Sequence, residues 1–126
     1  MTDTTSARLL PWDDVPLETV NEFMQRKVIT GELLTVARIW FKDGFLVPRH
    51  SHHNEQITQV IRGRMRFRFG DDGEDERMLG PGDVIVIPPH LPHEALCIGE
   101  VEEMDMWAPR RDDWLDGSDD YLRGGG

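Results

Sequence analysis

The sequence predicts an all-β fold, and three observations support this prediction. Residues 64–69 alternate polar and apolar side chains with a period of two, which places Met65, Phe67 and Phe69 on one face of a strand. Only residues 16–25 have a pattern that is compatible with a helix. Turn signals recur along the rest of the chain, at 42–44, 62–63, 71–73, 80–82 and 88–89. Many short strands at such spacing are typical of a sandwich or a small barrel.

The other elements follow in chain order. Residues 28–30, just beyond the possible helix, are more typical of a strand, and residues 33–41 are rich in β-branched and aromatic side chains. The acidic segment 70–76 predicts a solvated hairpin turn, because glycine and aspartate tolerate positive φ angles. Residues 83–87 predict a short buried strand. The glycine-rich segment 116–126 predicts a flexible C-terminal tail.

The chain as a whole predicts one domain spanning residues 1–126, with residues 1–30 as an N-terminal extension or outer strands. The formal charge of −10 argues against a nucleic-acid partner. The sequence has no apolar run long enough for a transmembrane span, and its first residues lack the pattern of a secretion signal. The single cysteine, Cys97, cannot form an internal disulfide, so a reducing cytoplasm is the expected location.

The segment HSHHNEQ, residues 50–56, contains three of the five histidines. Because side chains two apart on a strand point the same way, His50 and His52 are expected to point together. Gln56 is an even number of positions from both histidines and so is expected on their face of the strand, whereas Glu55 is expected on the other face. These histidines could be surface side chains bound to water, but such a pair favours a metal site if further donors converge on it.

A further donor has to come from a distant segment, and residues 88–93 contain the only other histidines, His90 and His93. His93 enters a new strand, in which it shares a face with Ala95 and Cys97. His93 is therefore the better candidate ligand, and His90 is expected to lie in a loop.

The two segments together resemble the motifs of the cupin superfamily. The first motif consists of glycine, five residues, HxH, three residues, a carboxylate or amide residue, six residues and a second glycine. In this chain Gly44 and Gly63 are the two glycines, residues 50–52 are the HxH and Gln56 is the amide. The second matches from Gly82 through Pro88 to His93, although His90 replaces a usual glycine. This resemblance implies a jelly-roll β-barrel that holds a metal inside, and pairing of two chains through their outer sheets as a homodimer. The ligands that it implies are His50, His52, Gln56 and His93.

The implied ligand set is unusual in its charge. Gln56 stands where such proteins usually have glutamate, so all four ligands are neutral and one divalent ion would keep its full charge. Such an ion is a strong Lewis acid and favours an anionic oxygen ligand. Nickel, zinc, manganese, iron, cobalt and copper all suit three imidazoles and an amide to some degree. Because no ligand is a carboxylate, an acid–base group has to come from another strand.

Residues 102–111 are the candidate source of that group. Asp105 and Trp107 share one face of the expected strand and Met104 and Met106 the other, and periodicity alone leaves open which face is the core. The segment resembles the D-x-aromatic-x-P-x-R ending of a KdgF-like group of small cupins, which linearises unsaturated uronate sugars. The resemblance implies that Asp105, Trp107 and Arg111 surround a small sugar, with Trp107 where that group usually has phenylalanine.

Each implied role has a physical basis. Asp105 near a cation could shuttle a proton, Arg111 could clamp a sugar carboxylate, and Trp107 could offer a flat face to a pyranose ring. Two alternatives remain at this point. One is a cupin dioxygenase with a redox metal, and the other is a metal-dependent sensor or ligand carrier without turnover.

Overall fold

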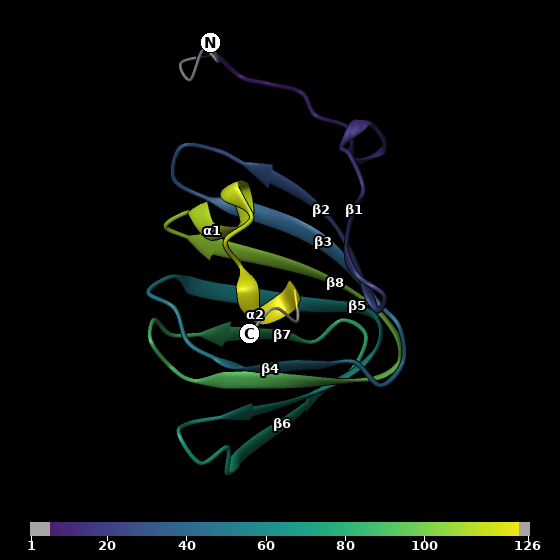
Figure 1. Ribbon diagram of the computed structural model, residues 1–126, viewed down its shortest axis with the longest axis vertical. Helices are drawn as coiled ribbons and strands as arrows, with labels where there is room; N and C mark the ends of the chain where they lie inside the picture. Colours follow the sequence, from purple (N-terminus) through teal and green to yellow (C-terminus); the bar gives the residue numbers. More distant parts are fainter. Residues whose placement is uncertain (1–5, 124–126) are drawn as a thin grey trace.

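Two long strands, β5 (Glu55–Phe69) and β8 (His93–Ala108), organise the protein by pairing with each other along nearly their whole length. The structure is a computed structural model that describes residues 6–123. Its eight strands form a jelly-roll barrel in which every strand pair is antiparallel (Figure 1). The other elements, in chain order, are η1 (Trp12–Asp14), β1 (Glu18–Asn21), β2 (Met24–Thr30), β3 (Thr35–Phe41), β4 (Leu46–His50), β6 (Asp75–Leu79), β7 (Val84–Ile87), α1 (Asp112–Asp116) and α2 (Asp120–Arg123). The all-β prediction is confirmed.

The long strands bend near their middles, so each contributes to both halves of the barrel. One half has the order β1-β2-β3-β8-β5 with β7 beside β5, and the other joins β4, β8, β5 and β6. The register of β5 against β8 shifts around Gly63, where the backbone has φ 82°. A Cβ atom at Gly63 would collide with the backbone carbonyl of Glu100, so the two strands approach closely only because this residue is glycine.

The inner face of the barrel follows the predicted alternation. Met65, Phe67 and Phe69 are all buried, and on β8 the buried positions include His93, Ala95 and Cys97. Strand β3 alternates strictly between buried and half-buried residues from Thr35 to Phe41. Side chains from both halves therefore meet in one apolar core, and the end of the barrel that carries the groove lined by residues 50–54 and 110–113 is called its open end.

Two sequence-based expectations were wrong. Residues 16–25 form the β1–β2 hairpin rather than a helix, because the Asn21 side chain accepts a hydrogen bond from the Phe23 amide at 2.8 Å and closes the turn. Val20 and Met24, four residues apart, are both buried by this turn, which produces the same pattern as a helix face. Strand β7 pairs with β5 as its one strand partner among the described residues and is buried on one face only: Val84 and Val86 are 58% and 57% exposed, whereas Ile85 is half-buried and Ile87 is buried.

The described part of the C-terminal segment is folded, in contrast to the flexible tail expected over residues 116–126, and residues 124–126 of that tail lie outside the described residues. Residues 112–123 form α1 and α2, which lie in front of the strands (Figure 1). Leu122 is 3% exposed, and its carbonyl accepts a hydrogen bond from Asn21 Nδ2 at 2.8 Å. Asp119 is 1% exposed and pairs with Arg26 of β2 at 2.7 Å. Within the described residues, this segment therefore packs against the open end of the barrel.

Among residues 6–123, no helix is long and apolar enough to cross a membrane.

Candidate metal centre

Three histidines meet at the open end of the barrel, and they are called the histidine cluster below. His50 ends β4, His52 follows in the loop, and His93 begins β8 directly opposite His50 in the strand register. Each histidine has a ring nitrogen that lies within 4.8 Å of a ring nitrogen of the other two. The ring centroids of His50 and His93 are 4.3 Å apart, and those of His52 and His93 are 5.0 Å apart. The predicted convergence of two distant segments is therefore present.

Backbone carbonyls orient all three rings in the same way. The Nδ1 atom of His50 lies 2.8 Å from the Pro48 carbonyl, and that of His93 lies 2.8 Å from the Leu91 carbonyl. The Nδ1 atom of His52 lies 3.0 Å from the backbone carbonyl of Asn54. Because a carbonyl only accepts, each Nδ1 carries the proton and each Nε2 keeps a free lone pair. This is the arrangement that metal-binding histidines usually show.

The environment keeps these imidazoles neutral. Burial lowers the pKa of His50 to about 3, with a further contribution from the neighbouring His93 ring. Burial lowers the pKa of His52 to about 4, and the positive charge of Arg111 adds to the effect. Burial also lowers the pKa of His93. Since only the neutral ring can bind a metal, the site is prepared for one at neutral pH.

Gln56 completes the set of donors at the start of β5. Its Oε1 atom lies 3.1 Å from His52 Nε2 and accepts a hydrogen bond from Trp107 Nε1 at 2.9 Å. Its Nε2 atom donates to Thr58 Oγ1 at 2.8 Å, which fixes the orientation of the amide. With the His52 proton on Nδ1, two lone pairs face each other across 3.1 Å. The buried His93 Nε2 also lacks a hydrogen-bond partner among residues 6–123. A cation bound between these atoms would satisfy all of them, so the donor set fits a metal ion.

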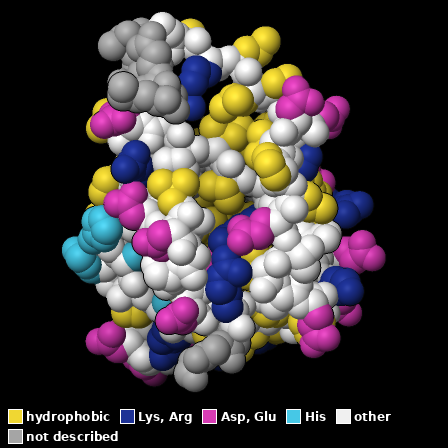
Figure 2. Space-filling view, turned by 45° about the horizontal axis from the view of Figure 1, so that its top comes forward, with side chains coloured by type: hydrophobic (Ala, Val, Ile, Leu, Met, Phe, Trp, Pro, Cys, Tyr) yellow, Lys and Arg dark blue, Asp and Glu magenta, His cyan; other side chains and the backbone are white. Residues whose placement is uncertain are grey.

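The two remaining histidines lie outside the cluster. His90 is exposed and lies in a turn with φ 67°, as expected for a loop residue, and its backbone amide donates to the His52 carbonyl at 2.8 Å. His53 is exposed in the loop after His52. Figure 2 shows histidine side chains, in cyan, gathered at one edge of the molecular surface.

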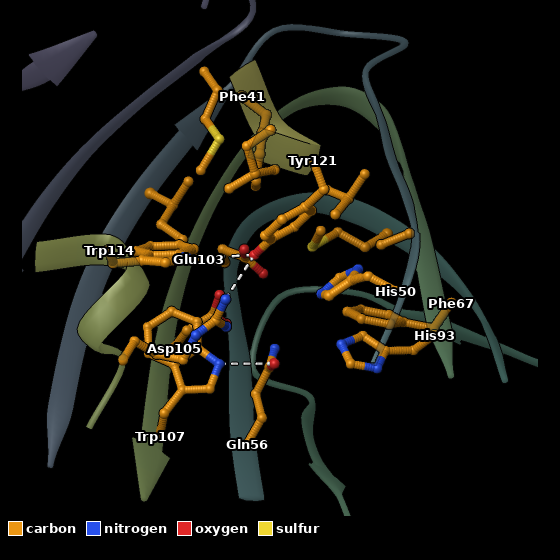
Figure 3. Close-up of a pocket in the computed structure, with 17 residues that line it drawn as sticks. Phe41, His50, Gln56, Phe67, His93, Glu103, Asp105, Trp107, Trp114 and Tyr121 are labelled. Carbon is orange, nitrogen blue, oxygen red and sulfur yellow. Dashed lines mark hydrogen bonds between the residues drawn. The ribbon is translucent and has the colours of Figure 1, made fainter. Parts of the chain in front are cut away.

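Asp105 and Trp107 both point inward, which settles the question that periodicity left open. They are 4% and 2% exposed, whereas Met106 is 39% exposed on the outer face. Figure 3 shows both side chains in the same cavity as the histidines. Burial raises the pKa of Asp105 to about 6, while hydrogen bonds from Thr58 and Glu103 and the charge of Arg111 limit the rise. A carboxyl group with such a pKa can exchange a proton near neutral pH.

Trp107 presents no open face in this structure. Its ring lies 4.6 Å from that of Trp114, and the Arg111 guanidinium lies 5.2 Å from its centroid. Its indole nitrogen instead holds Gln56 in place. Its role as a platform for a sugar stays a prediction.

Arg111 is buried rather than a surface residue, at 3% exposure. Its Nε and Nη2 atoms donate to the two carboxylate oxygens of Asp113 at 2.9 and 2.7 Å. Nη2 also donates to the Tyr121 hydroxyl at 3.0 Å. Within residues 6–123, Nη1 has no such partner, so it is the nitrogen available to an anionic ligand.

Two spaces meet at this site. The inner cavity, of about 40 Å³, contains Asp105, Glu103, Gln56 and Trp107. An outer groove of about 400 Å³ lies over the loop that carries His52 and over residues 110–113. The residues that line both spaces, and so form the wall between them, are His50, Arg111 and Tyr121.

Sequence reasoning missed two residues of this site. Glu103 lies on the same face of the strand as Asp105 and Trp107, so the alternation that groups those two residues also groups Glu103 with them. Tyr121 stacks on His50 with ring centroids 4.4 Å apart, although it belongs to the segment expected to be a flexible tail. No local pattern indicated this contact.

Comparisons with known proteins agree with this architecture. The family model described as a cupin domain matches residues 41–107. Among solved structures, an RmlC-like cupin from Shewanella frigidimarina is 25% identical with a TM-score of 0.78, over 86% of this chain and 96% of that one. KdgF from Halomonas sp. is 29% identical with a TM-score of 0.74, over 82% of this chain and 95% of that one.

A more distant structure shares the fold alone. Oxalate decarboxylase from Bacillus subtilis, a protein with Mn(II) centres, is 17% identical with a TM-score of 0.70, over 86% of this chain and 32% of that one. No curated protein sequence matches the chain. The cupin model covers both histidine segments and more than half of the sequence, so the chain belongs to the cupin family.

Proposed function

We propose that the protein opens the ring of a small 4,5-unsaturated uronate without oxidation, giving a linear keto sugar. The observation that carries this proposal is the placement of Asp105 and Arg111 in one connected site with the histidine cluster. The resemblance of this segment to the KdgF-like group supports the choice of substrate, as does the similarity in structure to KdgF from Halomonas sp..

The metal-binding residues in this proposal are His50, His52, His93 and Gln56. When bound, a divalent transition metal (nickel, zinc, manganese, iron, cobalt or copper) would act as a Lewis acid that polarises a sugar oxygen. The carbonyl acceptors at Nδ1 hold the three rings in the orientation that such binding needs.

Asp105 is the proposed base and acid. As a carboxylate it would take the proton of the anomeric hydroxyl while the bond between the anomeric carbon and the ring oxygen breaks. The bonding electrons move onto the ring oxygen and give an enolate, and return of the proton to C4 gives the ketone. The reaction is an isomerisation that consumes no oxidant. A pKa of about 6 lets Asp105 serve in both directions near neutral pH.

Arg111 is the proposed partner of the sugar carboxylate, through its free Nη1 atom. Asp113 and Tyr121 hold the guanidinium in place, so it is already oriented when an anion arrives. Trp107 would contribute the wall beneath the sugar. Since the inner cavity is only about 40 Å³, a sugar in the outer groove would reach Asp105 only after Tyr121 moves aside.

The test is the Arg111→Ala variant on unsaturated galacturonate generated by a lyase, followed by loss of the enol-ether absorbance. Because the variant lacks the counter-charge, we expect catalytic efficiency to fall roughly a hundredfold or more, with unchanged metal content. Arg111→Lys should recover only part, since an ammonium lacks the planar fork.

The matched control is Arg77→Ala. Arg77 lies on β6, pairs with the exposed Asp75 at 2.7 Å and lines neither space of the site, so its loss should leave the activity unchanged. Wild-type activity in Arg111→Ala would overturn the uronate assignment. Consumption of oxygen together with substrate would indicate a dioxygenase instead.

We also propose that two chains pair through the outer face of the sheet, in a reducing cytoplasm. Support comes from apolar side chains that this face exposes, Val84, Val86 and Met106. Ile57 lies between the last two in the strand register, so the exposed side chains form a continuous patch.

A further inference from the structure

A second carboxyl group, Glu103, lines the same inner cavity as Asp105 (Figure 3). The two residues alternate on β8, so both point inward, and each is 4% exposed. The strand neighbours of Glu103 are Ile39 and Val60, both fully buried apolar residues. The proposed reaction does not itself use this buried acid.

In the part of the chain that the structure describes, the polar partner of the Glu103 carboxyl is the carboxyl of Asp105. Among the same residues, Glu103 Oε2 and Asp105 Oδ1 have no hydrogen-bond partner. Within residues 6–123, neither group forms an ion pair with a lysine, arginine or histidine. Two carboxylates in contact in a water-poor cavity cannot both be charged, so this pair must share a proton.

The charged and titratable groups around the pair do not change this conclusion. Arg111 faces Asp105 but is bound to Asp113, and Arg26 from β2 is bound to Glu18 and Asp119. The other titratable groups that face the pair from neighbouring elements are His50, His93, Cys97 and Tyr121. None of them donates a hydrogen bond to Glu103.

The surroundings also decide which group keeps the proton. Asp105 accepts a hydrogen bond from Thr58 and feels the charge of Arg111, both of which favour its ionised form. Glu103 has only apolar strand neighbours and the negative charge of Asp105, and burial raises its pKa well above the ordinary value. Glu103 is therefore the neutral member of the pair.

We propose that Glu103 is a positioning residue that keeps its proton and donates it in a hydrogen bond to Asp105, so that Asp105 is the ionised base. The catalytic meaning of this arrangement rests on the proposed function, whereas the shared proton does not. The proton on Glu103 is not consumed: Asp105 accepts the proton from the sugar and returns it, and Glu103 holds the carboxylate in one orientation throughout.

The first test needs no substrate. In the metal-loaded protein at neutral pH, infrared spectroscopy should detect the carbonyl band of a protonated, buried carboxyl group, which shifts in D₂O. The band should be absent in Glu103→Gln. It should persist in Glu100→Gln, a matched control on the same strand whose side chain is 76% exposed. Absence of the band in the wild-type protein, or its persistence in Glu103→Gln, would overturn the proposal.

The second test uses the pH profile of kcat/KM. An amide in Glu103→Gln still donates a hydrogen bond to Asp105, so the acidic limb should stay within a few tenths of a pH unit of wild type. Glu103→Leu removes the hydrogen-bond donor, so the acidic limb of the profile should move up by about one pH unit. At a fixed pH on this limb, kcat/KM would then be roughly tenfold lower than in wild type. Equal profiles for all three proteins would refute a positioning role.

The two tests separate this proposal from the proposed function. If the infrared band behaves as expected but no uronate is turned over, the substrate assignment fails and the shared proton stands. If Glu103→Leu does not fold, the infrared comparison of wild type with Glu103→Gln still decides the question.

Discussion

The pair Arg26–Asp119 holds the C-terminal segment over the open end of the barrel, and Asp119→Ala tests how much this contact contributes. Both side chains are 0% exposed, and Arg26 Nη1 lies 2.7 Å from Asp119 Oδ2. Arg26 also packs over the Trp114 ring at 4.0 Å, while its Nη2 atom has no hydrogen-bond partner in the described part of the chain. Removal of Asp119 would leave a buried guanidinium with only Glu18 as its counter-charge.

The magnitude follows from this burial. Breaking a buried ion pair by removing one partner typically costs about 3–5 kcal/mol, because an uncompensated charge stays in a water-poor site. The second partner of Asp119, Arg123, is 29% exposed, and its loss adds at most about 1 kcal/mol. We therefore expect Asp119→Ala to lower the free energy of unfolding by about 3–5 kcal/mol, a large share of the usual total.

Urea unfolding followed by tryptophan fluorescence measures this change, since Trp114 lies on the segment that is held. The control is Asp112→Ala, which breaks an arginine–aspartate pair of similar length whose side chains are 41% and 71% exposed. It should cost less than about 1 kcal/mol. The double variant Arg26→Met with Asp119→Leu should recover much of the loss, because apolar side chains carry no desolvation cost. Equal effects for Asp119→Ala and Asp112→Ala would show that water compensates Arg26.

Three further outcomes are expected. Elemental analysis should find close to one transition metal per chain, and replacement of both His50 and His52 by alanine should abolish it; retained metal would refute the site. Below a pH of about 6.5 the unfolded chain binds protons that the folded histidine cluster does not, because burial lowers the pKa of His50 to about 3 and of His52 to about 4. The Tm of metal-free wild-type protein should therefore fall more steeply from pH 6.5 towards pH 4 than the Tm of the His50→Ala/His52→Ala variant, and equal slopes would contradict this. Gly63→Ala should destabilise the protein by more than about 1 kcal/mol in urea, whereas Gly44→Ala, with open space around its Cβ position, should cost less.

Local sequence patterns were sufficient for the all-β fold and for much of the candidate site. Strands carry their own signal, because alternation fixes which side chains share a face whatever lies opposite. This alternation placed Met65, Phe67 and Phe69 together, and the resemblance of the two histidine segments to the cupin motifs implied that His50 and His93 would meet.

The errors arose where a local pattern has two structural solutions. Val20 and Met24 are four residues apart, which suits a helix face, but a tight hairpin also buries both. The apolar run of β7 is the same for a buried strand and for one that exposes Val84. Neighbouring strands decide between these solutions, and residues close in sequence contain no information about them.

Only the tertiary structure decided the contacts that define the chemistry of the site. The fork of Arg111 is bound by Asp113, Tyr121 covers His50, and Glu103 faces Asp105 in a cavity without a cation bound to either carboxyl in the described chain. Each of these contacts depends on how the C-terminal segment and both long strands pack at one end of the barrel. The sequence by itself determined which donors were available and on which face they lie. Burial and the identity of the opposing groups, which set the pKa values and the free hydrogen-bonding atoms, depend on segments far apart in the chain.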